Sequence, residues 1–79
     1  MEKVNNFIDF LKQYDIEISC IIGVEDFIND TKATSLWKAK DLTDKEIFEN
    51  LNSRDMCSEA LRIYNELKLE YLNFINGIL

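Results

Sequence analysis

The chain contains no histidine, and this absence narrows the chemistry open to it. Histidine is the commonest general base at neutral pH and the commonest ligand of transition metals. The two cysteines, Cys20 and Cys57, lie far apart and do not have the spacing of a zinc site. There is also no glycine-rich loop that could hold a phosphate. We therefore expect no catalytic residue, no metal ligand and no cofactor, and predict that the protein is not an enzyme.

Proline is absent as well, and glycine occurs only at Gly23 and Gly77. All-β proteins use both residue types freely in turns, so their scarcity favours helices. The chain has 79 residues, of which 47% are hydrophobic, and this size suits a single small domain with a thin core. Residues 1–79 are thus predicted to form one all-α domain, a compact bundle of three to four helices with a long C-terminal helix.

An excess of positive charge is the third absence, since the formal net charge is −6. Long-range attraction to nucleic acid or to an anionic lipid surface is therefore disfavoured. Residues 31–45 form a small basic island, with four lysines and two aspartates, between two acidic ends. No signal peptide and no run of about 18 apolar residues is visible. We expect a cytoplasmic protein without a membrane span, whose two cysteines stay reduced and buried.

The last third of the chain carries the clearest pattern, because apolar residues recur there at alternating steps of three and four. They are Cys57, Ala60, Tyr64, Leu67, Tyr71, Phe74 and Ile78. This is the a/d spacing of a heptad, and it predicts one helix from Ser53 or Asp55 to about Asn76, capped by Gly77. Tyrosines and an alanine in the seam, with further apolar residues beside it, suit the core of a bundle better than a two-stranded coiled coil. A homo-oligomer joined through this seam is the alternative.

The rest of the chain gives four further predictions. Residues 3–14 have helical periodicity, and the sequence of residues 43–46 (Thr-Asp-Lys-Glu) is a capping box that begins a short helix ending near Asn52. Residues 16–30 fit a helix with Asp15 as its N-cap, although Gly23 weakens it. The alternation of isoleucines over residues 16–22 also fits a short strand, which would make the fold α+β. Residues 31–42 are expected to be a connector.

Two places are candidates for binding another protein. Trp37 lies in the basic island beside Leu36, Lys38 and Lys40, where it could either plug one end of the bundle or anchor a partner. Leu69 falls on the polar face of the predicted C-terminal helix, and with Leu72 and Leu79 it could form an apolar patch. The predicted protein-binding residues are therefore Leu36, Trp37, Lys38, Lys40, Leu69 and Leu72.

The abundance of Ile, Asn, Lys, Asp and Glu suggests AT-rich codons, and hence a low-GC bacterium or one of its viruses. Small size, acidity and helicity resemble, in general type only, the inhibitor proteins that bacterial viruses make against host proteins. We therefore expect a non-enzymatic module that binds and modulates a host or cellular protein, in the host cytoplasm if it is viral. The alternatives are a homo-oligomeric structural protein and an acidic mimic of nucleic acid that blocks a DNA-binding protein. The protein is expected to be a monomer or a homodimer. It is also expected to bind no nucleic acid directly.

Overall fold

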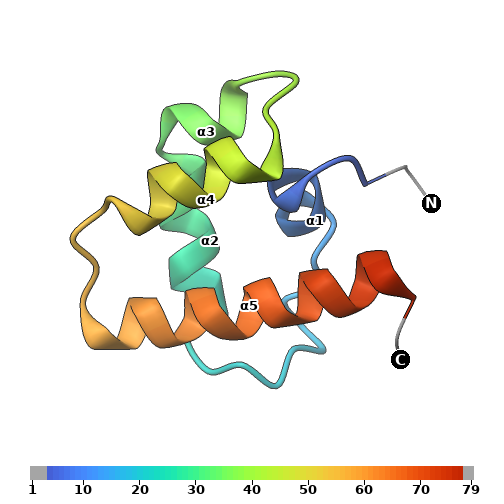
Figure 1. Cartoon of the computed structure of the whole chain (residues 1–79). Coiled ribbons are helices and arrows are strands. Elements are labelled where there is room, and N and C mark those ends of the chain that lie inside the picture. The colour runs from blue at the N-terminus through green and yellow to red at the C-terminus, as the bar shows by residue number, and fades with distance from the viewer. Residues whose placement is uncertain (1–3, 78–79) are drawn as a thin grey trace.

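The computed structural model describes residues 4–77, which form five α-helices and no strand (Figure 1). The helices are α1 (Phe7–Lys12), α2 (Val24–Lys32), α3 (Ser35–Lys38), α4 (Asp44–Asn52) and α5 (Ser58–Asn76). In Figure 1, α5 runs along one side of the molecule and the shorter helices lie over it. The predicted all-α bundle is confirmed. The α+β alternative is wrong, because the described part of the chain contains no strand. The count exceeds four because one turn of the expected connector is the helix α3.

Helix α4 begins at the predicted capping box. The Glu46 backbone N–H donates to Thr43 Oγ1 at 3.2 Å, and the Thr43 N–H donates to Glu46 Oε1 at 3.3 Å. These bonds satisfy two backbone donors that the first turn of a helix cannot pair internally. The start and the end of α4 therefore agree with the prediction.

Helix α5 is shorter than predicted at its N-terminus, because it starts at Ser58 and not near residues 53–55. The backbone N–H groups of Ser53 and Arg54 donate back to carbonyls of α4, so this segment completes the preceding helix. Nineteen residues give α5 a length of roughly 28 Å. Gly77 ends it with φ at 71°, the left-handed conformation expected of a C-terminal glycine cap.

The middle of the heptad seam forms the inner wall of the bundle. Tyr64, Leu67 and Tyr71 are almost fully buried against the other helices. Towards its ends the seam is no longer buried, since Cys57 and Phe74 are exposed and Ala60 is half-buried. Ile78 lies outside the described residues. The remaining core residues come from all five helices. They are Phe7, Ile8, Leu11, Val24, Phe27, Ile28, Leu36, Ile47, Leu51 and Ile63.

One carboxylate joins three helices beside this core. Asp44 Oδ1 accepts the Phe7 N–H at 2.8 Å, and Asp44 Oδ2 accepts the Tyr71 hydroxyl at 2.7 Å. Burial, together with the bond to the Asp44 carboxylate, raises the pKa of the Tyr71 phenol far above its usual value. Tyr64 differs, because its hydroxyl is buried without a hydrogen-bond partner among the described residues. Burial alone raises the pKa of the Tyr64 phenol.

The prediction of a helix over residues 16–30 is wrong in its first half. Residues 13–23 are irregular, and α2 begins only at Val24. Short polar side chains compete with helical bonds here: Asp15 Oδ1 accepts the Glu17 N–H, and Ser19 Oγ accepts the Ile21 N–H, both at 3.1 Å. Gly23, with φ at 89°, then turns the chain into α2.

Two further expectations need correction. Helix α1 covers Phe7–Lys12 and not all of residues 3–14, because the Asn6 side chain accepts the Asp9 N–H and caps the helix there. Cys20 and Cys57 are free and exposed, not buried. Cys20 lies in the irregular segment, and Cys57 is the N-cap of α5, so neither occupies an inward position of a helix.

Candidate protein-binding surface

The predicted binding residues around α3 are largely used by the fold. Leu36 is only 5% exposed and belongs to the core, so it is not available to a partner. Trp37 is half-buried and packs against the core, while Lys38 and Lys40 are exposed. Of the two interpretations of Trp37, this packing supports the plug at one end of the bundle.

Positive charge converges on Trp37 from three helices. Lys12 Nζ lies 5.5 Å from the centroid of the Trp37 ring, and Lys32 Nζ lies 5.8 Å from it. These distances allow cation–π attraction. Lys12, Lys32 and Lys38 occupy the last turns of α1, α2 and α3, where a cation offsets the negative end of the helix dipole. We call Trp37 and these three lysines the Trp37 cluster; its charge already stabilises the fold.

The second predicted patch is only partly present. Leu69 is 61% exposed, as expected from its place on the outer face of α5. Leu72 is half-buried and packs against the core, so it does not extend the exposed surface of Leu69. The third residue of the patch, Leu79, lies outside the described residues. Leu69 therefore needs other apolar neighbours if it belongs to a binding surface.

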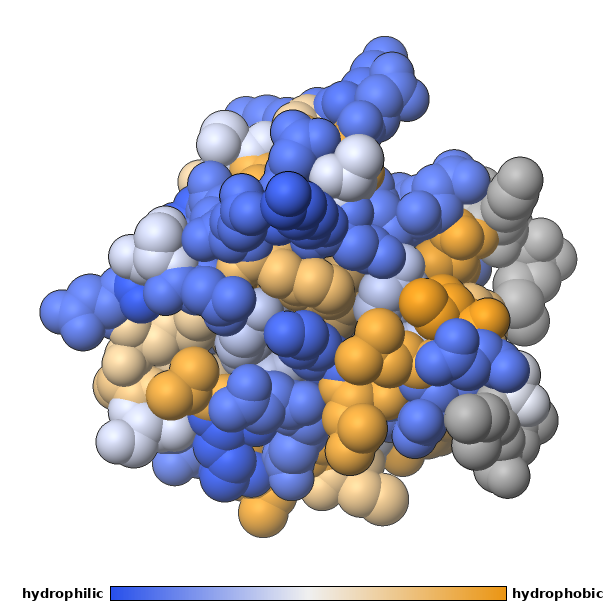
Figure 2. Space-filling view, viewed as in Figure 1, coloured by the Kyte–Doolittle hydropathy of each residue, from blue (hydrophilic) through white to orange (hydrophobic). Residues whose placement is uncertain are grey.

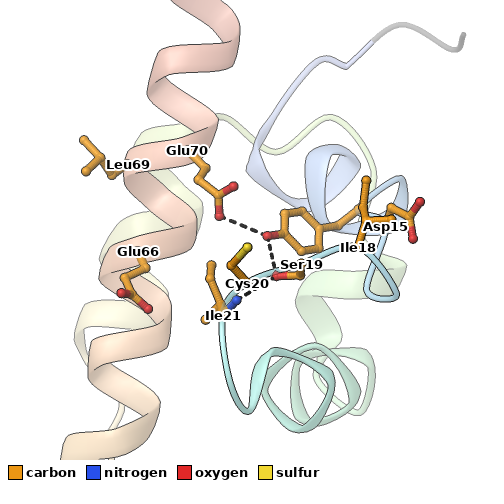
Figure 3. Close-up of a pocket in the computed structure, with 9 residues that line it drawn as sticks. Asp15, Ile18, Ser19, Cys20, Ile21, Glu66, Leu69 and Glu70 are labelled. Atoms are coloured by element: carbon orange, nitrogen blue, oxygen red, sulfur yellow. Dashed lines mark hydrogen bonds between the residues drawn. The ribbon is translucent and has the colours of Figure 1, made fainter. Parts of the chain in front are cut away.

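Such neighbours come from the irregular segment before α2, which lies along α5 (Figure 3). A shallow hollow of about 460 Å³ separates this segment from the helix. Its lining is formed by Tyr14, Asp15, Ile18, Ser19, Cys20, Ile21, Glu66, Leu69 and Glu70. Ile18 is 78% exposed beside it. In Figure 3, Glu70 points from α5 towards the segment, whereas Leu69 projects from the other side of the helix.

A tyrosine holds the segment against α5. The Tyr14 hydroxyl donates to Glu70 Oε2 at 3.0 Å and lies 2.9 Å from Ser19 Oγ. Burial is the main cause that raises the pKa of the Tyr14 phenol, and the Glu70 carboxylate adds to it. At neutral pH the phenol is therefore protonated and able to donate. Further along, Gly23 lies so close to α5 that a Cβ atom there would be 2.9 Å from Ile63 Cδ1.

A second hollow, of about 510 Å³, adjoins the first one along α5. It is lined by Ser58, Leu61, Arg62, Asn65, Glu66 and Leu69. Glu66 and Leu69 line both hollows, so the two lie next to each other on α5. We call their combined surface the α5 groove. In Figure 2, apolar atoms gather over the C-terminal part of α5, whereas the region of α3 is mostly hydrophilic.

The charges of the α5 groove are predominantly negative. Asp15, Glu66 and Glu70 contribute carboxylates, and Arg62 is the single cation in its lining. Arg62 is occupied, since its guanidinium lies 3.0 Å from both Glu59 Oε1 and Glu66 Oε2. The groove therefore joins exposed apolar side chains with carboxylates that no free cation of the lining neutralises.

Two other features are absent from residues 4–77. No group of three or more Cys, Asp or Glu side chains lies close enough there to hold a metal ion. No helix among these residues has the length and apolar character needed to cross a membrane.

Fold and surface together define the class as a small all-α protein with an acidic, partly apolar groove along its longest helix. A scan against protein-family models, a search of curated proteins and a search of solved structures each gave no match. The groove itself is therefore the feature that bears on function. Leu69 was predicted from the sequence as a binding residue, whereas Tyr14 and Ile18 were not. The isoleucine alternation over residues 16–22 was the available signal, and it was interpreted as regular secondary structure.

Proposed function

We propose that this chain is a non-enzymatic protein-binding module, which binds a cellular protein through the α5 groove and modulates or inhibits it. The observation that carries the proposal is the exposure of Ile18 and Leu69 beside one hollow. Single exposed apolar residues are common on protein surfaces, but two large ones flanking a shared concave surface are typical of a binding site. Most other large apolar side chains of the described residues are buried or half-buried.

The exposed apolar side chains of the groove suit the centre of an interface. Burying a fully exposed leucine or isoleucine contributes about 1.5–3 kcal/mol, so the two side chains could supply the centre of an interface. A standard interface covers about 800 Å² of each partner. That is about one seventh of the 5610 Å² surface of this molecule, so such an interface would extend beyond the groove.

The kind of partner follows from the sequence and is part of the same proposal. The composition suggests a low-GC bacterium or one of its viruses, and a short acidic chain without catalytic residues suits an inhibitor of a host protein. The competing homo-oligomer would use the heptad seam of α5. Tyr64, Leu67 and Tyr71 are buried within the same chain, so the middle of that seam is not free for a second copy.

Affinity capture from a low-GC bacterial lysate tests the proposal. The immobilised protein is compared with Leu69→Ser, which alters the groove, and with the double variant Lys38→Ser/Lys40→Ser, which alters exposed lysines near Trp37. We expect one protein to be retained by the unmodified chain and by the lysine variant, and to be lost from Leu69→Ser.

The captured protein is then purified, and its affinity and activity are measured with each variant. We expect an affinity loss of at least tenfold for Leu69→Ser, since about 1.4 kcal/mol corresponds to a factor of ten. Retention by Leu69→Ser and loss from Trp37→Phe would instead place the interface at the Trp37 cluster. If all variants retain the same proteins equally, the groove is not the binding surface.

A further inference from the structure

We infer that the α5 groove accepts a basic amphipathic helix of its partner, with apolar residues on one face and lysines or arginines beside them. This inference rests on the proposed function and adds the chemistry of the partner segment. It follows from three properties of the groove: its charge, the spacing of its apolar side chains and the way in which its walls are held.

Charge is the first property. The carboxylates of Asp15, Glu66 and Glu70 surround the apolar hollow. The hydrogen bonds of Asp15 and Glu70 come from neutral donors, the Glu17 N–H and the Tyr14 hydroxyl. Neither carboxylate has a lysine or arginine as an ion-pair partner among the described residues. A partner that brought cations would complete these pairs, whereas an acidic partner would meet repulsion.

Spacing is the second property. Leu61 and Leu69 are 45% and 61% exposed and lie in the same hollow, eight residues apart on α5. Their separation along the helix axis is about 12 Å. In a partner helix, apolar residues at positions i and i+7 lie about 10.5 Å apart, so two such anchors match the two leucines. An extended strand has less to bind here, because the described chain presents no open strand edge for backbone pairing.

Preorganisation is the third property. In the first hollow, one wall is the helix α5, and the other is the segment held by the Tyr14 hydroxyl and by the approach of Gly23 to Ile63. The second hollow is lined by α5 alone. Ile18 stands on that second wall with its side chain already exposed. A surface that needs little rearrangement loses less free energy when it binds. The groove is thus formed before the partner arrives.

Synthetic peptides provide the probe. A panel of helical peptides of about 14 residues, roughly 21 Å long, carries leucines at i, i+3 or i+4, and i+7, with lysines beside them. The matched control peptides have glutamate at every lysine position. A second control keeps the basic composition but scrambles the leucine spacing. Binding is followed by fluorescence anisotropy and by the backbone amide signals of the isotope-labelled protein.

We expect at least one basic amphipathic peptide to bind at least tenfold more tightly than its glutamate counterpart and its scrambled counterpart. The amide signals that shift should belong to residues 14–21 and to the part of α5 from Ser58 to Glu70. Raising the salt concentration should weaken binding, because ions screen the charge pairs. Ile18→Ser and Leu69→Ser should each weaken it at least fivefold, whereas Lys38→Ser should change it less than twofold.

Four results would overturn the inference: equal binding of acidic and basic peptides, no binding by any basic peptide, amide shifts centred on Trp37, or self-association of the chain that Leu69→Ser abolishes. The last result would identify a second copy as the occupant. The proposed function is tested separately by protein capture. A captured protein that depends on Leu69 but binds through a neutral or acidic segment would leave that function intact and remove the basic helix.

Discussion

The Trp37 cluster and the α5 groove are two charged surfaces of one small molecule, and the fold uses them differently. At the Trp37 cluster, lysines from three helix ends lie near an aromatic ring or a helix terminus that each can stabilise. In the α5 groove, the carboxylates of Asp15 and Glu70 have no ion-pair partner within residues 4–77, and Ile18 and Leu69 face solvent.

This difference separates a patch that packs within the fold from one that we propose binds a partner. Both surfaces combine apolar side chains with charges mostly of one sign, so composition alone does not separate them. The cations of the Trp37 cluster lie where an aromatic ring or a helix terminus can stabilise them, so removing a member should mainly cost stability. The α5 groove leaves part of its charge and apolar area unsatisfied, and removing a member should mainly cost binding. Each prediction below tests one side of this contrast.

The largest expected effect compares two leucines. Leu36→Ala removes a side chain that is 5% exposed and should lower the free energy of unfolding by about 3 kcal/mol, because it leaves a cavity. Leu69→Ala removes one that is 61% exposed and should change it by less than about 0.5 kcal/mol. Urea unfolding followed by circular dichroism measures both. Similar losses in the two variants would break the contrast.

A second prediction concerns the segment that forms one wall of the groove. Gly23→Ala should destabilise the protein by about 2 kcal/mol, because alanine resists the positive φ and its Cβ would be 2.9 Å from Ile63 Cδ1. Gly77→Ala is the matched control, since its φ is also positive. A Cβ atom added there would meet no side chain or distant backbone of the described residues within 4 Å. This substitution should cost about 1 kcal/mol. Thermal unfolding of both variants would show whether contact with α5 adds to the backbone strain.

Tyr14→Phe should lower the free energy of unfolding by about 1 kcal/mol, since it removes the bonds to Glu70 and Ser19. The pKa of the Tyr14 phenol is raised in the folded protein, so its contribution is complete below the unfolded pKa of about 10 and is lost as the pH rises through the folded value. Urea titrations at pH 7 and above pH 10 should therefore show a smaller deficit of Tyr14→Phe at the higher pH. A constant deficit would contradict a role for the protonated phenol.

Removing one cation of the Trp37 cluster should have a smaller effect. Lys12→Gln and Lys32→Gln should each lower the free energy of unfolding by about 0.5–1 kcal/mol, because each loses cation–π attraction and compensation of a helix dipole. Lys45→Gln, at an exposed position in the first turn of α4, is the control and should be neutral or slightly stabilising. If neither loss exceeds that of the control, the cluster does not satisfy its own charge.

The smallest effect is expected at Tyr64, whose buried hydroxyl finds no hydrogen-bond partner in the described part of the chain. Tyr64→Phe should change the free energy of unfolding by less than about 0.5 kcal/mol at pH 7, since no hydrogen bond is lost. Because burial raises the pKa of this phenol, the unmodified protein should lose stability as the pH rises above about 10, and Tyr64→Phe should lose less. Tyr71→Phe is the contrasting variant, because it breaks the bond to Asp44 and should be destabilising at pH 7.

Regular elements with a local signal were predictable. The capping box of residues 43–46 fixed the start of α4, and the seam through Tyr64, Leu67 and Tyr71 identified the buried face of α5. Both signals act between residues within one or two turns of the same helix, so they can be recognised without knowing the rest of the fold.

Residues 13–23 were not predictable in the same way. The isoleucine alternation fits a strand, and the spacing of Cys20 and Val24 fits a helix, but neither pattern encodes the Tyr14 contact with Glu70, 56 residues away. Leu36 and Trp37 show the same limit, because adjacent residues differ in burial according to which helices cover them. The candidate site was therefore predicted at Leu69 and missed at Tyr14 and Ile18.

The sequence by itself determined the all-α class, the capping of α4, the inner face of α5 and the scarcity of catalytic residue types. These properties depend on composition and on short-range spacing along the chain. Only the tertiary structure decided that lysines of three helices meet at Trp37, and that the segment before α2 forms a groove with α5. Those arrangements depend on which distant residues pack into the same core. In so short a chain, each helix must bury its apolar face against elements that are far away in the sequence.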